Sequence, residues 1–169
     1  FMFRPPGEEK FRTFCHLRWW FGNTASPTAA QLAVIKTAET VEEELPLGFH
    51  IVTQRRYMDD SIESTKTEEE AIRGVEESIK IFDIAGMKVQ KLISNSKEVM
   101  LSVPKEIRLK EYESGDLPTT KVLGYPWNPN LDILSIPTAS LSKKVEPTTK
   151  RKLLHLLATV YDPIGLIRL

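Results

Sequence analysis

The sequence has little cysteine, and this scarcity limits how the chain can be held together. Cys15 is the only cysteine among 169 residues, so the chain forms no internal disulfide. A lone thiol is typical of a protein kept in a reducing compartment, and we expect it to pack as a small apolar side chain.

Other absences narrow the class of protein further. No apolar run is long enough for a membrane-spanning helix. Lys and Arg total 23 residues, and Asp and Glu also total 23, so any nucleic-acid contact must rest on local patches rather than on net charge. The three histidines, His16, His50 and His155, have no Cys or His partner at ligand spacing, and no zinc site is predicted. The hydrophobic share of 41% and the charged share of 27% are ordinary for a globular chain with a core.

Capping and periodic residues predict three helices. We expect them over residues 26–44, over residues 68–85, and from a cap at Thr148 or Thr149 to a stop before Pro163. Ser26 is expected to cap the first helix, and Pro27 suits its first turn. Thr67 with Glu70 forms a capping box for the second helix, which Gly86 ends.

Aromatic and β-branched runs between turn signals predict the strands. We expect strands over residues 12–21, 49–54, 61–64 and 87–93, a further candidate over 98–103, and a hairpin of 121–127 with 131–137 across Asn128-Pro129-Asn130. The stretch 104–118 is expected to be loop. This order of elements favours an α+β fold with antiparallel hairpins over a parallel array of strand–helix–strand units.

The most informative segment is Tyr57-Met58-Asp59-Asp60, a bend expected to follow the strand over 49–54. Adjacent carboxylates repel each other, and one would take up a proton unless a cation lay between them. Mg²⁺ suits such a place, because it prefers oxygen ligands and is commonly held by one or two carboxylates together with substrate phosphates. The alternative is a polar, Asp-rich hairpin turn with no metal.

Four further segments accompany this one in a fixed order. In chain order the five are Arg18-Trp19-Trp20-Phe21-Gly22 with Ala25-Ser26-Pro27, then Tyr57-Met58-Asp59-Asp60, then Gly86-Met87-Lys88-Val89-Gln90-Lys91 with Ser94-Asn95-Ser96, then Leu123-Gly124-Tyr125-Pro126-Trp127-Asn128-Pro129, and last Thr149-Lys150-Arg151 with Tyr161-Asp162-Pro163-Ile164-Gly165-Leu166. Together they resemble the palm of a reverse transcriptase, and more narrowly the polymerase region of BEL/Pao-type long-terminal-repeat retrotransposons. The chain departs from that pattern at Asn23-Thr24, where an apolar residue is usual, and at Asn128, where Asp is usual.

The resemblance implies a partial polymerase palm over residues 1–145 and the start of a thumb or connection helix over residues 146–169. Phe1 is not an initiator Met and Leu169 closes an apolar stretch, so we expect a piece of a longer polyprotein. In the family another catalytic Asp lies upstream of the Phe-Gly segment. Between Phe1 and Phe21 the only acids are Glu8 and Glu9, in a turn, and neither replaces it.

The resemblance also implies the chemistry, which is RNA-directed DNA synthesis by two-metal nucleotidyl transfer onto a primer 3′ hydroxyl. Asp59 is the first candidate ligand for two Mg²⁺ ions, with Mn²⁺ as a substitute, and Asp60 either shares the metals or accepts local hydrogen bonds. The implied partners are an RNA or DNA template–primer, deoxynucleoside triphosphates, and the fingers, RNase H, peptidase and integrase of the polyprotein. The implied location is the cytoplasm, in the element's virus-like particle, without secretion or membrane attachment.

The family pattern places further side chains near the primer or nucleotide, namely Tyr57, Met58, Phe21, Gly22, Ser26 and Lys91. Tyr57 and Met58 either contact a sugar or base or fill the core beneath the hairpin. Gly22 either permits close backbone approach or is a plain turn glycine, and Ser26 begins a helix in both cases. Lys91 and Lys88 either help protonate the pyrophosphate leaving group or hold a triphosphate, as the resemblance implies, or lie on a solvated strand face. Candidates for the nucleic-acid backbone are Arg55, Arg56, Lys143, Lys144, Lys150, Arg151 and Lys152.

Two other interpretations remain open at this point. One is a catalytically dead or co-opted remnant that acts at most as a nucleic-acid or protein interaction module. The other is a generic α+β binding module in which Tyr57-Met58-Asp59-Asp60 is accidental and has no metal affinity.

Overall fold

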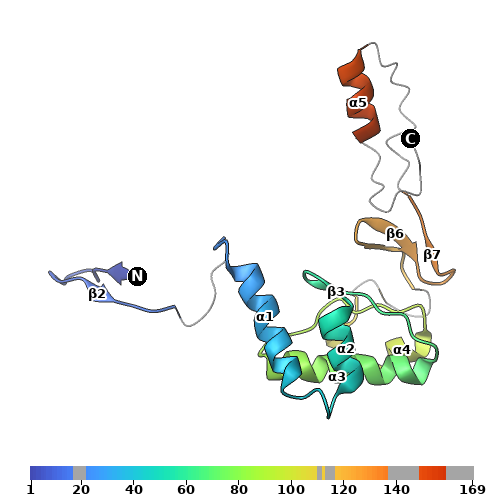
Figure 1. Cartoon of the computed structure of the whole chain (residues 1–169), viewed down its shortest axis with the longest axis horizontal. Coiled ribbons are helices and arrows are strands. Elements are labelled where there is room, and N and C mark those ends of the chain that lie inside the picture. The colour runs from blue at the N-terminus through green and yellow to red at the C-terminus, as the bar shows by residue number, and fades with distance from the viewer. Residues whose placement is uncertain (17–21, 110–111, 113–116, 137–148, 159–169) are drawn as a thin grey trace.

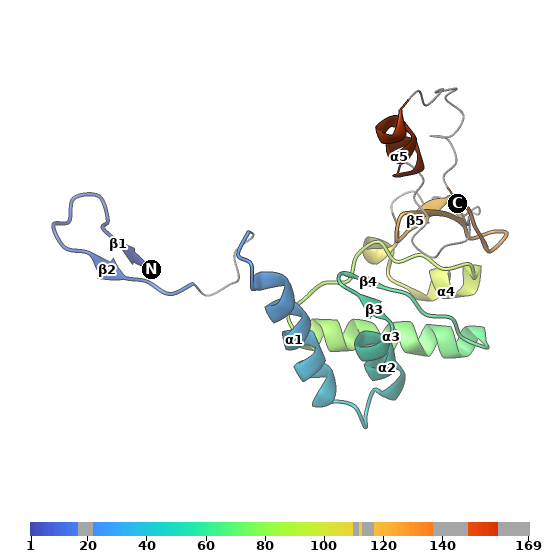
Figure 2. The ribbon, with the colours of Figure 1, turned by 45° about the horizontal axis from the view of Figure 1, so that its top comes forward.

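The computed structural model describes residues 1–16, 22–109, 112, 117–136 and 149–158. In these residues helices are mixed with small antiparallel sheets, which confirms the α+β class. Figures 1 and 2 show three helices, α1 (Ser26–Glu39), α2 (Pro46–Gln54) and α3 (Glu68–Ile84), against one another. The hairpin of β1 and β2 lies apart from them.

The remaining helices are α4 (Lys97–Ser102), the 3₁₀ turn η1 (Lys105–Ile107) and α5 (Lys150–Ala158). The strands are β1 (Met2–Phe3), β2 (Arg12–Thr13), β3 (Arg56–Tyr57), β4 (Asp60–Ser61), β5 (Thr120–Val122), β6 (Tyr125–Asn128) and β7 (Ile133–Leu134).

A small apolar core joins α1, α2 and α3. Its fully buried members are Val34, Ala38, Val52 and Ile81. Partly buried apolar side chains pack around them, namely Val41, Leu45, Phe49, Phe82, Ala85 and Met87. Burying a side chain such as Ile81 contributes about 1.5–3 kcal/mol, so this core holds the body that carries the neighbouring hairpin. Among the described residues, no helix is long and apolar enough to cross a membrane.

The expected strand over residues 49–54 is wrong, because this stretch belongs to α2. Pro46 stands in the first turn of that helix, where its missing N–H costs nothing. The carboxylate of Glu77, on α3, accepts hydrogen bonds from the backbone N–H groups of Leu47 (2.8 Å) and Gly48 (2.9 Å). A side chain distant in sequence therefore satisfies the free amides at the helix start, and this tertiary contact outweighs the local strand preference of Ile51-Val52-Thr53.

Two glycines lie where α2 and α3 approach each other closely. A Cβ added to Gly48 would lie 2.6 Å from the backbone carbon of Glu77, and one added to Gly74 would lie 2.8 Å from Cδ1 of Ile51. A side chain at Gly48 would push the helices apart, because it would meet the backbone of α3, whereas one at Gly74 would require only the flexible end of the Ile51 side chain to move. Gly48 is therefore the position that the close approach of α2 and α3 requires.

The limits of α3 confirm the expected signals. The Thr67 hydroxyl accepts from the N–H of Glu70 (3.2 Å), although the Glu70 carboxylate bonds the N–H of Lys66 (3.2 Å) rather than that of the capping residue. At the other end Gly86 has a φ of 70°. The N–H of Met87 bonds the carbonyl of Phe82 (2.8 Å), as in a Schellman cap.

The first helix differs from its expected form at both ends. Ala25 is its N-cap, so Ser26 lies inside the first turn beside Pro27 rather than capping it. Asn23 forms a turn just before the helix, in which its Oδ1 accepts a hydrogen bond from the N–H of Ala25 (3.1 Å). The helix ends at Glu39, and turns rather than helix follow up to residue 44.

Other expected strands are shorter than predicted or absent. Residues 87–93 hold only an isolated bridge from Leu92 to Arg108, and residues 98–103 lie mostly in α4, whose cap Ser96 accepts from the N–H of Val99 (3.2 Å). The expected strand over 61–64 shrinks to the end of β4, and the expected loop 104–118 contains η1. Of residues 12–21 only the first two are strand, and 17–21 lie outside the described residues. Cys15 is exposed, so its expected packing is wrong.

The expected hairpin across Asn128-Pro129-Asn130 is present as β6 and β7. The Oδ1 of Asn128 accepts from the N–H groups of Asn130 (3.0 Å) and Leu131 (3.2 Å). What was expected as one strand over 121–127 is itself a hairpin, β5–β6, turning at Leu123-Gly124. Of the two expected caps for the last helix, Thr149 accepts from the N–H of Lys152 (3.2 Å), while Thr148 and residues 159–162 lie outside the described part.

Candidate functional site

The two candidate carboxylates belong to the hairpin β3–β4, which follows α2 in the chain (Figure 1). In the β3–β4 pair, Arg56 lies opposite Ser61 and Tyr57 lies opposite Asp60. Met58 and Asp59 therefore form the whole turn, and Met58 has a φ of 53°. Directly opposite residues point to the same face of a hairpin, so Tyr57 and Asp60 share one face.

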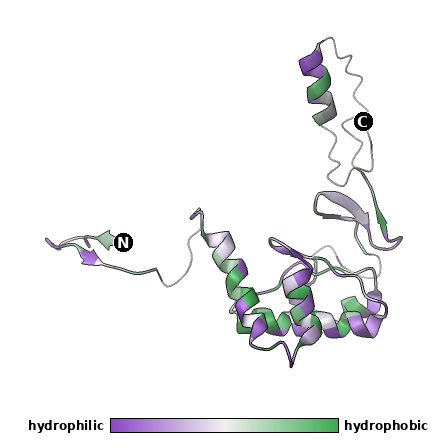
Figure 3. Ribbon diagram, in the orientation of Figure 1, coloured by the Kyte–Doolittle hydropathy of each residue, from purple (hydrophilic) through white to green (hydrophobic). Residues whose placement is uncertain are grey.

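The tip of this hairpin is open to solvent. Tyr57 is 61% exposed and Met58 is 63% exposed, which excludes the alternative that they fill the core beneath the hairpin. Asp59 and Asp60 are exposed as well. Figure 3 shows the hairpin as a hydrophilic projection next to helices of mixed character. Both carboxylates and both neighbouring large side chains are therefore available to a ligand.

Arg56 supports the turn from below. Its Nε donates to the carbonyl of Met58 (2.9 Å), and its guanidinium carbon lies 5.5 Å from the ring centre of Phe82 on α3. Burial lowers the pKa of Arg56, while the negative charge of Asp59 acts in the opposite direction. The buried Nη1 atom has no hydrogen-bond partner in the described part of the chain.

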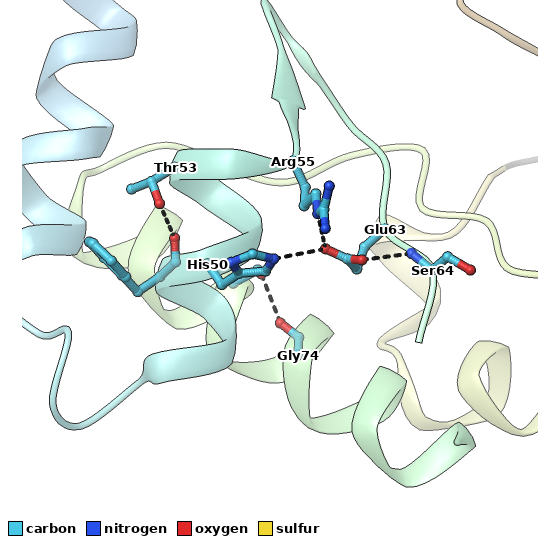
Figure 4. A network of polar contacts seen from close by, with 8 residues as sticks. His50, Thr53, Arg55, Glu63, Ser64 and Gly74 are labelled. Atoms are coloured by element: carbon cyan, nitrogen blue, oxygen red, sulfur yellow. Dashed lines mark hydrogen bonds and ion pairs between the residues drawn. The ribbon is translucent and has the colours of Figure 1, made fainter. Parts of the chain in front are cut away.

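A second set of polar contacts closes the base of the hairpin (Figure 4). Glu63 accepts from Nε of Arg55 (3.1 Å) and lies 3.7 Å from Nε2 of His50, and its other oxygen accepts from the N–H of Ser64 (2.9 Å). The N–H of Ile62 bonds the carbonyl of Arg55 (2.9 Å). Half-exposed ion pairs of this kind contribute little to stability, but they tie the return segment to α2.

Asp59 and Asp60 suit a hard cation such as Mg²⁺ in their donor chemistry. Within the described residues neither carboxylate makes an ion pair or a side-chain hydrogen bond, so their oxygens are available as ligands. The same part of the chain contains no group of three or more His, Cys, Asp or Glu side chains arranged to hold a metal ion. The hairpin thus offers two carboxylates, and further ligands would come from a nucleotide or another segment.

The other residues expected near a nucleotide are not gathered around this hairpin by any contact of the described residues. Gly22 has a φ of 85°, which explains a glycine there through the turn alone. Ser26 is half-buried at the start of α1, and Lys91 is exposed with a φ of 59°. Its neighbour Leu92 bonds Ile107 and Leu109. Phe21, Lys143 and Lys144 lie outside the described residues.

The basic candidates fall into two environments. Arg55 is paired with Glu63 and Arg56 is half-buried, so both already have partners at the hairpin. Lys150, Arg151 and Lys152 are exposed in the first turn of α5. Cations near a helix N-terminus oppose the helix dipole, and an anion bound there would relieve that repulsion.

Sequence reasoning missed the contacts that hold the hairpin. The sequence indicates only phosphate contacts for Arg56 and no role in the hairpin for Glu63 or His50. The signal for Glu63 is its opposite charge to Arg55: Ile62 bonds the Arg55 carbonyl across the hairpin and Glu63 is the next residue, an arrangement visible only once the strand register is known.

Comparisons of the chain with models of protein families, with curated proteins and with solved structures find no match.

Proposed function

We propose that the chain is a palm segment of an RNA-directed DNA polymerase of the BEL/Pao retrotransposon type. The observation that supports this most is the exposed Asp59-Asp60 pair at the tip of a hairpin, in the second of five segments that follow the family's order. In this proposal the parent protein extends a primer by nucleotidyl transfer, using deoxynucleoside triphosphates and an RNA or DNA template.

Asp59 and Asp60 would hold the catalytic Mg²⁺ of such a polymerase. When bound, the metal supplies stabilisation of the attacking and leaving oxygens at the α-phosphate. Tyr57 and Met58 present exposed side chains beside the carboxylates, where a primer-end sugar or base could pack. The exposed cations Lys150, Arg151 and Lys152 would neutralise phosphates of the template–primer.

The proposal assigns no independent polymerase activity to these 169 residues. By the resemblance, a third catalytic Asp lies upstream of the Phe-Gly segment. The described residues contain no carboxylate group that completes the pair at Asp59 and Asp60. We therefore expect no primer extension by this chain alone, and extension only when the fingers and the upstream Asp are supplied.

Metal binding by the chain itself tests the proposal. Electron paramagnetic resonance of Mn²⁺ should report weak binding that Asp59→Asn reduces at least about tenfold, since a ligating carboxylate is lost. Asp60→Asn should reduce it as well. Asp83→Asn is the matched control. It also removes an exposed carboxylate, but from α3 and not from the hairpin turn.

Unchanged Mn²⁺ binding in Asp59→Asn would contradict the proposal and favour a generic binding module. Binding that depends on Asp59 leads to the second experiment, primer extension by a longer polyprotein segment containing the upstream Asp. Extension that is lost in Asp59→Asn supports an active polymerase. Metal binding without any extension favours the alternative function, a catalytically dead or co-opted remnant that serves as an interaction module.

A further inference from the structure

Arg56 differs from the other arginines near the hairpin, because it faces the protein rather than the solvent. Arg55, its neighbour, is exposed and paired with Glu63. The guanidinium of Arg56 instead lies over the ring of Phe82, with its central carbon 5.5 Å from the ring centre. Its Nε donates to the Met58 carbonyl at 2.9 Å. One side chain thus connects α3 to the turn that contains Asp59.

This arrangement is costly as a purely stabilising device. A buried N–H without a partner costs free energy, and Nη1 of Arg56 has none among the described residues. Burial also disfavours the charged form, which lowers the pKa of Arg56. An apolar side chain over Phe82 would avoid both costs but would leave the Met58 carbonyl without its donor.

We propose that Arg56 is a positioning residue for the Asp59-Asp60 pair. Its planar guanidinium fork lies over the Phe82 ring while its Nε donates to the Met58 carbonyl, and this link to α3 fixes the turn in which Met58 has a positive φ. Lysine carries the same charge but lacks the planar fork, so it would not reproduce this contact. The inference rests on the proposed function for its purpose, but the anchoring of the turn is testable without any metal.

Hydrogen exchange of the metal-free full chain tests the anchoring directly. In Arg56→Lys, amides of residues 57–62 should exchange about tenfold faster than in the wild type, because a charge-assisted hydrogen bond to the turn is lost. Amides in the middle of α3 should be unchanged. Equal exchange in the hairpin would overturn the inference.

Arg108→Lys is the matched control. Arg108 is also half-buried, its Nε also donates to a backbone carbonyl (Val103, 2.8 Å), and its guanidinium lies 5.9 Å from the ring of Tyr112. This variant should loosen its own surroundings and leave hairpin exchange as in the wild type. Faster hairpin exchange in Arg108→Lys would mean a general loss of stability and would overturn the inference. Phe82→Leu is the second variant, since it removes the ring beneath the guanidinium and keeps an apolar side chain; it should also speed hairpin exchange.

Mn²⁺ affinity then separates positioning from charge. If the fork positions the carboxylates, Arg56→Lys should weaken Mn²⁺ binding roughly tenfold, as loss of a residue that orients a ligand does. If Arg56→Lys binds Mn²⁺ like the wild type, its charge alone matters and the inference is overturned. A third outcome separates the two proposals. If Asp59→Asn binds Mn²⁺ as tightly as the wild type but Arg56→Lys still speeds exchange in the hairpin, the anchoring by Arg56 is supported and the proposed polymerase function is contradicted.

Discussion

Two hairpins of this protein close through turns of equal length but of different chemistry. In β5–β6, Val122 pairs with Tyr125, and both turn residues, Leu123 (φ 48°) and Gly124 (φ 90°), have positive φ as in a type I′ turn. In β3–β4 the turn is Met58-Asp59, and the positive φ of 53° falls on Met58 alone, as in a type II′ turn. That position usually holds glycine, and here it does not.

The two hairpins also differ in how far their tyrosine side chains are exposed to solvent. Tyr125 is only 6% exposed, and its strand belongs to a three-stranded sheet. Tyr57 is 61% exposed in a two-stranded hairpin. Both turns place a non-glycine residue at a positive φ, Leu123 in one and Met58 in the other. Only the hairpin with adjacent carboxylates combines this strain with an exposed tyrosine and with a half-buried arginine, Arg56, whose Nη1 has no hydrogen-bond partner among the described residues. Departures from stabilising chemistry that gather at one point are typical of a functional site.

Replacing Tyr125 and Tyr57 by alanine, one at a time, should give the largest difference between the two hairpins. Tyr125→Ala should lower the free energy of unfolding by about 3 kcal/mol, because it empties a buried aromatic position. Tyr57→Ala should change it by less than about 0.5 kcal/mol, because the ring is exposed. Urea denaturation followed by tryptophan fluorescence measures both, with Trp127 on β6 as the local reporter. Similar losses in the two variants would show that the hairpins do not differ as described.

Exchanging the turn chemistry should produce effects of opposite sign. Gly124→Ala places a Cβ on a residue with a φ of 90° and should destabilise the protein by about 1 to 2 kcal/mol. Met58→Gly removes a Cβ from the strained position, and the relief exceeds the added chain entropy by about 0.5 kcal/mol. Denaturant midpoints of both variants check the signs. Destabilisation by Met58→Gly would mean that its side chain contributes packing that outweighs the backbone strain.

Local signals in the sequence were enough to predict the parts of the fold that depend on neighbouring residues. Thr67 and Gly86 mark the ends of α3 because a cap and a left-handed stop act within one turn of the helix. The bend at Asp59 was predicted for the same reason. These interactions involve residues at most a few positions apart, so they are visible without knowledge of the fold.

The identity of α2 could not be predicted in this way. Its β-branched residues favour a strand locally, and the contact that satisfies the helix start comes from Glu77, 29 residues beyond Gly48. The close approach that requires Gly48 is likewise made with α3. A helix that depends on one neighbour can be recognised only when that neighbour's position is known.

The candidate site divides along the same line. Asp59 and Asp60 were found from the sequence because adjacent carboxylates are a local pattern. Arg56 and Glu63 were not given their supporting roles, because those depend on which face of the hairpin meets Phe82 and on which residues lie opposite each other. The bend that contains the two carboxylates was therefore predictable from neighbouring residues, whereas the contacts that hold this bend were not.

Acid should act at the start of α3 and should spare the turn of β5–β6. The backbone N–H of Glu69 and then the hydroxyl of Thr67 stabilise the Glu69 carboxylate and lower its pKa, with slight desolvation opposing them. A carboxyl whose pKa is lower in the folded state stabilises the protein above the unfolded value of 4.5, and that contribution is lost as the pH falls through the folded pKa. The effect should be small, because Glu69 is exposed and solvent screens its interactions.

Thermal melts between about pH 6 and about pH 3 measure this contribution against the general acid loss. Glu69→Gln should show a shallower fall of Tm over the acid part of that range. Thr67→Ala should show a partial reduction of the same slope, since it removes the second of the two hydrogen bonds to the Glu69 carboxylate, and it should also lower Tm at every pH because the cap on the N–H of Glu70 is lost. Exchange of amides at the start of α3 should speed up in acid in the wild type more than in Glu69→Gln, while the amides of Leu123 and Gly124 respond alike in both. An identical acid slope in Glu69→Gln would place the pH dependence in carboxyl groups other than that of Glu69.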